Sequence, residues 1–220
     1  WTRIEFGDVQ GFGFLGSTIF AGTFIKGVFR SDDNGTTWVA SNTGLPRQIT
    51  PPTTSVSVLG FTTIGQKLLV GTLYDGVYAS MDTGRTWHPS NRGTEGTVVN
   101  SFAMVGQNLL TGSTLGIFMS RDTGSTWTSV LSGRRIFSLA VSGSTAFASG
   151  DGIFRSTDNG STWTPISPTI ATLYSSNAVV ANRSGVFAGT TAGVYFSSDA
   201  GNTWMAKNNG IAKAVPTAFL

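Results

Sequence analysis

The eight residues Ser31-Asp32-Asp33-Asn34-Gly35-Thr36-Thr37-Trp38 recur four more times along the 220-residue chain. The other copies are SMDTGRTW (80–87), SRDTGSTW (120–127), STDNGSTW (156–163) and SSDAGNTW (197–204). All five fit the pattern S-x-D-x-G-x-T-W, here called the octet, and Trp1-Thr2 matches the tail of a sixth copy cut off upstream. Tryptophans that recur roughly every 36–49 residues indicate a repeat architecture.

The residue types of the octet predict a tight turn between two strands. An aspartate side chain accepts backbone N–H bonds inside a turn, a glycine adopts positive φ without steric cost, and a tryptophan ring packs against neighbouring strands. We therefore expect a structural role for the aspartates and tryptophans of the five octets. These residues are Asp33, Asp82, Asp122, Asp158, Asp199, Trp38, Trp87, Trp127, Trp163 and Trp204.

The residues around each octet are typical of short strands. Four residues before the octet serine, a glycine is followed by Val or Ile and an aromatic residue, as in Gly27-Val28-Phe29. Upstream lie a second short strand, such as residues 20–23, and an apolar strand, such as residues 138–141. Four strands per repeat predict an all-β chain of four-stranded antiparallel β-propeller blades. The composition agrees, since 29 glycines and 11% charged residues disfavour helices and disorder.

The octets resemble the Asp-box, or BNR repeat, of β-propellers. This repeat occurs in sialidases, sortilin-type receptors, xyloglucan-cleaving glycosidases and photosystem II assembly factors, and the resemblance covers nearly the whole chain. It implies a propeller in which the octets lie on the face opposite the ligand site. Because the same repeat serves enzymes, receptors and assembly factors, the resemblance is specific for a fold and leaves the function open.

The five repeats predict a single β-propeller domain over residues 1–220. Trp1 to Phe6 matches the last strand of a preceding repeat, and residues 213–220 resemble the first strand of another. Three arrangements are consistent with these partial strands: a segment of a larger propeller, a ring completed by self-association or further blades, and a five-blade ring with ragged ends.

The loops expected opposite the octets hold a notable share of the polar residues that could bind a ligand. Long loops on a rigid scaffold often determine binding specificity. The hypothesis that follows is a non-catalytic binding or scaffold module that presents this face to a carbohydrate, a peptide or a protein. The expected ligand-binding residues are Arg47, Tyr74, Arg92, Arg134, Arg135 and Tyr174.

A glycoside hydrolase of the Asp-box type is the alternative. Asp75 and Asp151 could act as a carboxylate pair, whose separation would decide between retention and inversion, and Glu95 is a third candidate. The Arg-Ile-Pro signature of sialidases is missing, because Arg3-Ile4 continues into Glu5. An assembly factor and a repeat protein selected for its fold alone are further hypotheses.

Other functions are disfavoured by composition. The 14 Lys and Arg face 11 Asp and Glu and include one basic doublet, so a nucleic-acid partner is not expected. A single histidine and no cysteine argue against a zinc site, and we predict no metal and no cofactor. No apolar run is long enough for a membrane helix. The surface rich in Ser and Thr, together with the habits of the family it resembles, favours an extracellular or periplasmic location.

Overall fold

The computed structural model describes residues 8–46, 56–166 and 176–210. Over these ranges the chain forms five antiparallel four-stranded sheets and contains no helix. Two compact units divide the sheets between them. The first comprises residues 1–100 and 122–127, and the second comprises residues 101–121 and 128–220.

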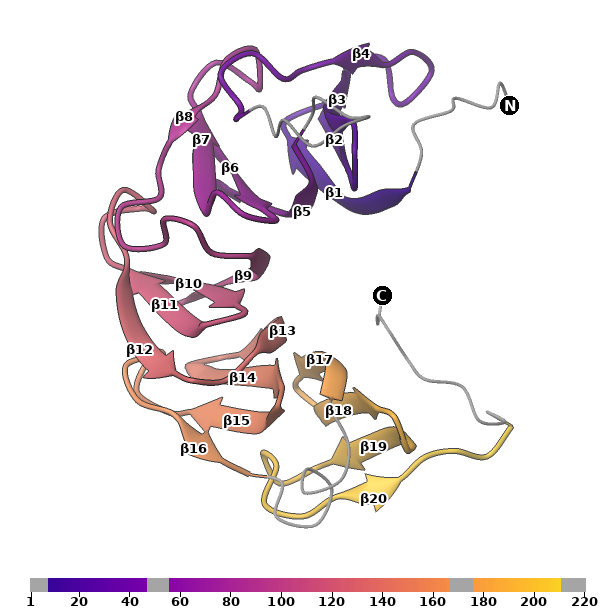
Figure 1. Ribbon diagram of the computed structural model, residues 1–220. Coiled ribbons are helices and arrows are strands. Elements are labelled where there is room, and N and C mark those ends of the chain that lie inside the picture. The colour runs from indigo at the N-terminus through magenta and orange to yellow at the C-terminus, as the bar shows by residue number, and fades with distance from the viewer. Residues whose placement is uncertain (1–7, 47–55, 167–175, 211–220) are drawn as a thin grey trace. The chain divides into compact units, whose positions relative to one another are not determined.

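Two sheets and one further octet turn make up the first unit. The first sheet contains β1 (Val9–Leu15), β2 (Thr18–Thr23), β3 (Gly27–Ser31) and β4 (Val39–Ala40). The second contains β5 (Val58–Ile64), β6 (Lys67–Thr72), β7 (Val77–Ser80) and β8 (His88–Pro89). Both sheets follow chain order, so each consists of consecutive hairpins (Figure 1).

The remaining strands follow the same plan, and nearly all of them lie in the second unit. The third sheet contains β9 (Val99–Val105), β10 (Asn108–Ser113), β11 (Gly116–Ser120) and β12 (Thr128–Ser132). The fourth contains β13 (Ile136–Ser142), β14 (Thr145–Gly150), β15 (Gly152–Ser156) and β16 (Thr164–Pro165). The fifth contains β17 (Ser176–Asn182), β18 (Gly185–Thr190), β19 (Gly193–Ser197) and β20 (Met205–Ala206).

The octet forms the turn between the third and fourth strands of every sheet. In the second sheet, the Asp82 carboxylate accepts the Thr86 N–H at 2.9 Å and the Thr86 hydroxyl at 2.6 Å. The Ser80 hydroxyl donates to Asp82 at 2.8 Å and accepts the Gly84 N–H at 2.8 Å. The same pair of bonds between the aspartate and the threonine recurs in all five octets.

Each octet also contains a non-glycine residue in the left-handed conformation, which the pattern S-x-D-x-G-x-T-W does not predict. The residue before the octet glycine has φ between 56° and 58°, and the residues concerned are Asn34, Thr83, Thr123, Asn159 and Ala200. Asparagine tolerates this conformation, whereas a β-branched threonine or an alanine adopts it at a steric cost. The hydrogen bonds around the aspartate hold these residues in place.

The first two sheets pack through their apolar faces. Phe20 of β2 and Val58 of β5 are fully buried in one core cluster. Phe61 of β5 lies against Gly13 and Gly22 of the first sheet, where a Cβ atom on either glycine would approach the Phe61 ring within 2.8 Å. The small residues of one sheet therefore make room for the aromatic ring of the next.

Three octet tryptophans donate hydrogen bonds to the carbonyl that directly follows an earlier fourth strand, whereas Trp38 and Trp163 donate within their own octets. The buried indole N–H of Trp87 donates to the Ser41 carbonyl at 2.8 Å, and that of Trp127 donates to the Ser90 carbonyl at 2.8 Å. In the second unit, the Trp204 N–H reaches the Ile166 carbonyl at 3.1 Å. The expected burial is complete for Trp87 and Trp127 only, since the other three rings are half-buried.

Replacing Trp87 by Phe should destabilise the protein by about 2 kcal/mol, because it leaves the Ser41 carbonyl without its donor in a buried site. Trp163→Phe is the matched control, since the Trp163 N–H bonds to Gly160 of its own octet and its ring is half-buried. Chemical denaturation of both variants checks this. Equal losses of stability would contradict a special role for the contact between sheets.

The octet carboxylates should make the protein sensitive to acid. The threonine hydroxyl and N–H hold the pKa of Asp33, Asp82, Asp158 and Asp199 at about 2, below the value near 3.9 of an unfolded aspartate. A lowered pKa stabilises the folded state above the unfolded value, and this contribution is lost as the pH falls from about 4 to 2.

We therefore expect the melting temperature to drop between pH 4 and pH 2. At neutral pH, Asp82→Ala should cost about 1–2 kcal/mol through the lost turn hydrogen bonds, and the variant should lose less stability on acidification than the parent protein. Thermal melts at several pH values measure both effects. A melting temperature that is constant down to pH 2 would refute the assignment.

Candidate functional site

The strand order of each sheet separates two ends. The turn between the first and second strands lies at the same end as the octet, which we call the octet end. The turn between the second and third strands lies at the other end with the connection to the next sheet, and we call this the open end. At the open end of the first unit, the Phe24 N–H donates to the Asp8 carbonyl at 2.9 Å.

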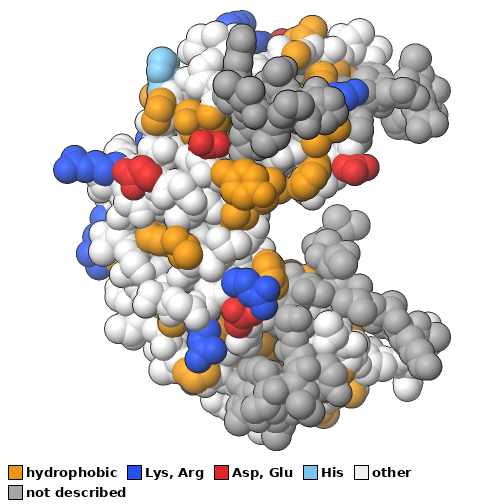
Figure 2. Space-filling model, in the orientation of Figure 1, with side chains coloured by type: hydrophobic (Ala, Val, Ile, Leu, Met, Phe, Trp, Pro, Cys, Tyr) orange, Lys and Arg blue, Asp and Glu red, His pale blue; other side chains and the backbone are white. Residues whose placement is uncertain are grey.

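Exposed apolar side chains mark the open end of the first unit. Phe24 and Ile25, in the turn between β2 and β3, are 43% and 40% exposed, and Tyr74, in the corresponding turn of the second sheet, is 58% exposed. The Ser57 hydroxyl donates to the Phe24 carbonyl and ties this turn to the start of the second sheet. Figure 2 shows exposed apolar side chains in several patches of the face in view.

The other predicted residues of the first unit lie in two places. Asp75 is in the turn between β6 and β7, and Arg92 and Glu95 are in the connection that follows β8. Arg92 is exposed, and its carbonyl accepts the Trp127 N–H at 2.9 Å. The Glu95 carboxylate accepts the Gly93 N–H at 2.7 Å and so closes its own loop. Asp75 is half-buried, and its carbonyl accepts the Asn91 side-chain amide at 2.9 Å.

In the second unit, Arg135 and Asp151 form a pair at the open end of the fourth sheet. The Arg135 guanidinium Nη2 donates to Asp151 Oδ1 at 2.8 Å, and the Arg135 backbone N–H donates to Oδ2 at 2.9 Å. The Arg135 side chain holds the pKa of Asp151 below its usual value, and the pKa of Arg135 is raised in return. Asp151 is therefore ionised at neutral pH and poorly suited to act as a general acid.

Arg134 is exposed beside this pair and forms no ion pair among the described residues. Leu115, in the turn between β10 and β11, is 55% exposed. Two predicted ligand-binding residues, Arg47 and Tyr174, lie outside the described residues. Asp75 belongs to the first unit and Asp151 to the second.

The apolar residues of the open end were not among the residues predicted from the sequence. Charged residues and tyrosines in the loops were predicted instead of Phe24, Ile25 and Leu115, which stand beside strand residues in the sequence. The signal that could have identified them is an apolar residue one to three positions before the glycine of the third strand. Among the residues that the structure describes, no three Asp, Glu or His side chains converge on a common point where a metal could bind.

No protein-family model matches the chain, and no match is found among the curated proteins. Solved structures do resemble it. An ancestral GH74 enzyme is 18% identical with a TM-score of 0.78 over 94% of this chain and 32% of its own. The extracellular domain of BT4673 from B. thetaiotaomicron is 18% identical with a TM-score of 0.67 over 86% and 27%. YCF48 bound to D1 peptide is 15% identical with a TM-score of 0.64 over 90% and 66%.

These similarities concern the fold alone. They support a β-propeller fold for a chain of repeated four-stranded antiparallel sheets. The chain spans about a third of the length of the GH74 enzyme. The proteins that share the fold include an enzyme and a protein bound to a peptide, so the function must be argued from the residues at the open end. Over the described ranges, no helix is long and apolar enough to cross a membrane.

Proposed function

We propose that the chain is part of an Asp-box β-propeller that acts as a non-catalytic binding or scaffold module. Its ligand would be a carbohydrate, a peptide or a protein bound at the open end. The single observation that carries this proposal is the exposure of Phe24, Ile25 and Tyr74 in equivalent turns of adjacent sheets.

The chemistry of these turns suits recognition. Aromatic rings stack on sugar faces and on apolar peptide side chains, and residues of this kind dominate binding energies when they are desolvated. Lys26 and Arg92 add positive charge at the same end of the first unit. The BT4673 extracellular domain shares the fold and favours an extracellular or periplasmic location for this chain as well.

A glycoside hydrolase is the second candidate, because the fold is shared with GH74 enzymes. The carboxylates of the open end give it less support. Asp151 is held by Arg135 and Glu95 closes its own loop, which leaves Asp75 as the remaining candidate of the three.

Replacing Tyr74 by Ala should weaken ligand binding at least tenfold, because a desolvated aromatic contact contributes about 2 kcal/mol or more. An array of oligosaccharides, including xyloglucan fragments, and of peptides identifies the ligand, and titration measures the loss. Met81→Ala is the control, since Met81 is 69% exposed but belongs to the octet of the second sheet. Equal affinities of the two variants would contradict a site at the open end.

The same oligosaccharides test the alternative. Hydrolysis that is abolished by Asp75→Asn or Asp151→Asn, with the melting temperature unchanged, would establish a glycosidase. Binding without hydrolysis would support the binding module.

We also propose that the outer face of β1 is covered by a second copy of the chain. Phe12 and Phe14 on this face are 57% and 61% exposed. The residue of β5 equivalent to Phe12 is Phe61, because Phe12 pairs with Ala21 and Phe61 pairs with Val70 in the same register. Phe61 packs against the preceding sheet. The same phenylalanine position is therefore packed against another sheet in β5 and exposed in β1. This difference indicates that the face of β1 can accept a further sheet.

The chain should therefore self-associate, and Phe12→Ser with Phe14→Ser should shift it to a monomer. Light scattering during gel filtration measures the mass of both proteins over a range of concentrations. Val39→Ser is the control, since Val39 is 61% exposed on β4 of the same sheet and should leave the association unchanged. A parent chain that is monomeric throughout would refute this proposal.

A further inference from the structure

At the octet end, a long side chain from the second strand of one sheet can reach the octet of the next sheet. Two such bridges are present among the described residues. Lys67, the first residue of β6, donates from Nζ to the Thr123 carbonyl at 2.9 Å. Asn108, the first residue of β10, donates from Nδ2 to the Asn159 carbonyl at 2.8 Å. Thr123 and Asn159 both occupy the left-handed position of their octets.

Between the fourth and fifth sheets, the bridge to the octet does not come from the first residue of the second strand. The first residue of β14 is Thr145, which is too short to reach the octet, and the left-handed octet residue is Ala200. The Ala200 carbonyl is instead satisfied by Arg155 of β15, whose Nη1 donates to it at 2.8 Å. Because the side chains of Thr145 and Ala200 are short, and Arg155 reaches the Ala200 carbonyl from another strand, a cavity of about 180 Å³ remains.

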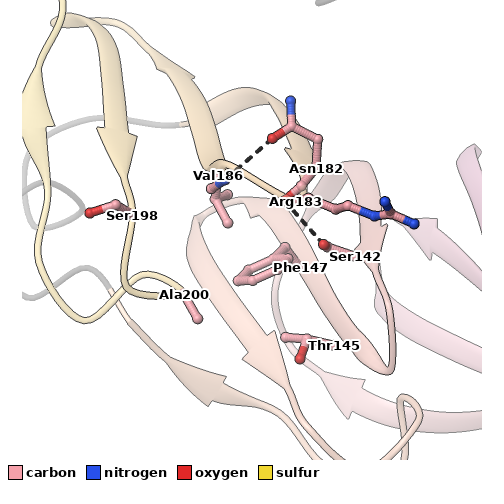
Figure 3. A pocket seen from close by; sticks show the side chains of 9 residues that line it. Ser142, Thr145, Phe147, Asn182, Arg183, Val186, Ser198 and Ala200 are labelled. Atoms are coloured by element: carbon pink, nitrogen blue, oxygen red, sulfur yellow. Dashed lines mark hydrogen bonds between the residues drawn. The ribbon is translucent and has the colours of Figure 1, made fainter.

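The cavity combines an apolar floor with a polar rim (Figure 3). Phe147 and Val186, each 2% exposed, form the floor, and Ser142, Thr145 and Ser198 contribute hydroxyl groups. The Ser142 hydroxyl donates to the Asn182 carbonyl at 3.1 Å and keeps its lone pairs as acceptors. Hydroxyl groups around an apolar floor suit a small molecule that carries several hydroxyl groups of its own.

Arg183 is the one charged side chain among the described residues that line the cavity. It extends along the rim past Ser142 (Figure 3), on a turn that Asn182 fastens by accepting the Ser184 N–H at 2.8 Å. Arg183 is exposed, so its side chain can change rotamer, and its guanidinium would have to turn back from beyond Ser142 to reach over the cavity. A guanidinium without a carboxylate beside it favours an anionic ligand, because it binds carboxylates through two parallel hydrogen bonds.

We propose that this cavity is a second binding site, at the octet end, for a sugar acid of the size of one hexuronate. Sites for drug-sized ligands measure about 300–1,000 Å³, so the cavity has room for a single sugar ring. The ring would lie on Phe147 and Val186, its hydroxyl groups would face Ser142, Thr145 and Ser198, and its carboxylate would pair with Arg183. The site is independent of the open end, where the proposed function places its ligand.

Titration of the full chain with D-glucuronate, followed by NMR or calorimetry, tests the proposal. Saturable binding is expected, and D-glucose and acetate should each bind at least tenfold more weakly because they lack the charge or the ring. Arg183→Gln should reduce glucuronate affinity at least tenfold, whereas Arg121→Gln, which changes an exposed arginine in the third octet, should have no effect.

Ala200→Asn provides a variant that fills the cavity and is expected to fold. Asparagine occupies the same left-handed position at Asn34 and Asn159, and here it should abolish binding. Absence of glucuronate binding, equal affinity for glucose, or retained affinity in both variants would overturn the proposal. An oligosaccharide that ends in glucuronate separates a free sugar acid from a chain end as the ligand. Tyr74→Ala should leave glucuronate binding unchanged, so failure here is distinct from failure at the open end.

Discussion

The hydrogen bonds between the octet aspartate and threonine are the interaction on which the other features of each sheet depend. In the fourth octet, Asp158 accepts the Thr162 N–H at 2.9 Å and the Thr162 hydroxyl at 2.7 Å. These bonds bring the chain back beside the third strand. They also hold Asn159, the residue after Asp158, in a left-handed conformation. The tryptophan that follows is thereby aimed at the preceding sheet. A local polar turn thus fixes the geometry in which apolar faces meet, and the low pKa of the aspartate is a consequence of the same bonds.

Contacts between sheets use the repeat in a directional way. In the first unit, the first sheet presents glycines toward the second sheet, and the second sheet presents an aromatic ring toward the first, as Gly22 and Phe61 do. The octet glycine takes part as well, because a Cβ on Gly84 would lie 2.4 Å from the Phe20 ring. Such an interface has two different sides, and any sheet at the end of a series keeps one side bare. Phe12 on β1 is exposed, whereas the equivalent Phe61 on β5 packs against the first sheet.

The strands and octet turns were predictable from the sequence because their determinants are local and repeated five times. The residue types and spacing of Asp82 and Gly84 predict a tight turn, and in the structure Asp82 accepts the Thr86 N–H while Gly84 has a positive φ. The candidate site was less accessible, since it depends on which side chains the fold leaves exposed. Arg135 and Asp151 are sixteen residues apart in the sequence, and this spacing does not predict that they pair. Phe20 and Phe24 are close in sequence and identical in type, yet Phe20 is fully buried and Phe24 is exposed.

Function in a repeat of this kind resides in departures from the pattern. Where the pattern is complete, a long side chain such as Lys67 or Asn108 seals the gap between neighbouring sheets, and the surface there has a purely structural role. Where short residues stand in those positions, as Thr145 and Ala200 do, the same gap opens and its lining can be shaped by selection without loss of the octet turn. The same holds at the open end, because Tyr74 and Phe24 lie outside the octets. The stabilising turns and the exposed loops can therefore change independently, so a shared fold does not fix the function.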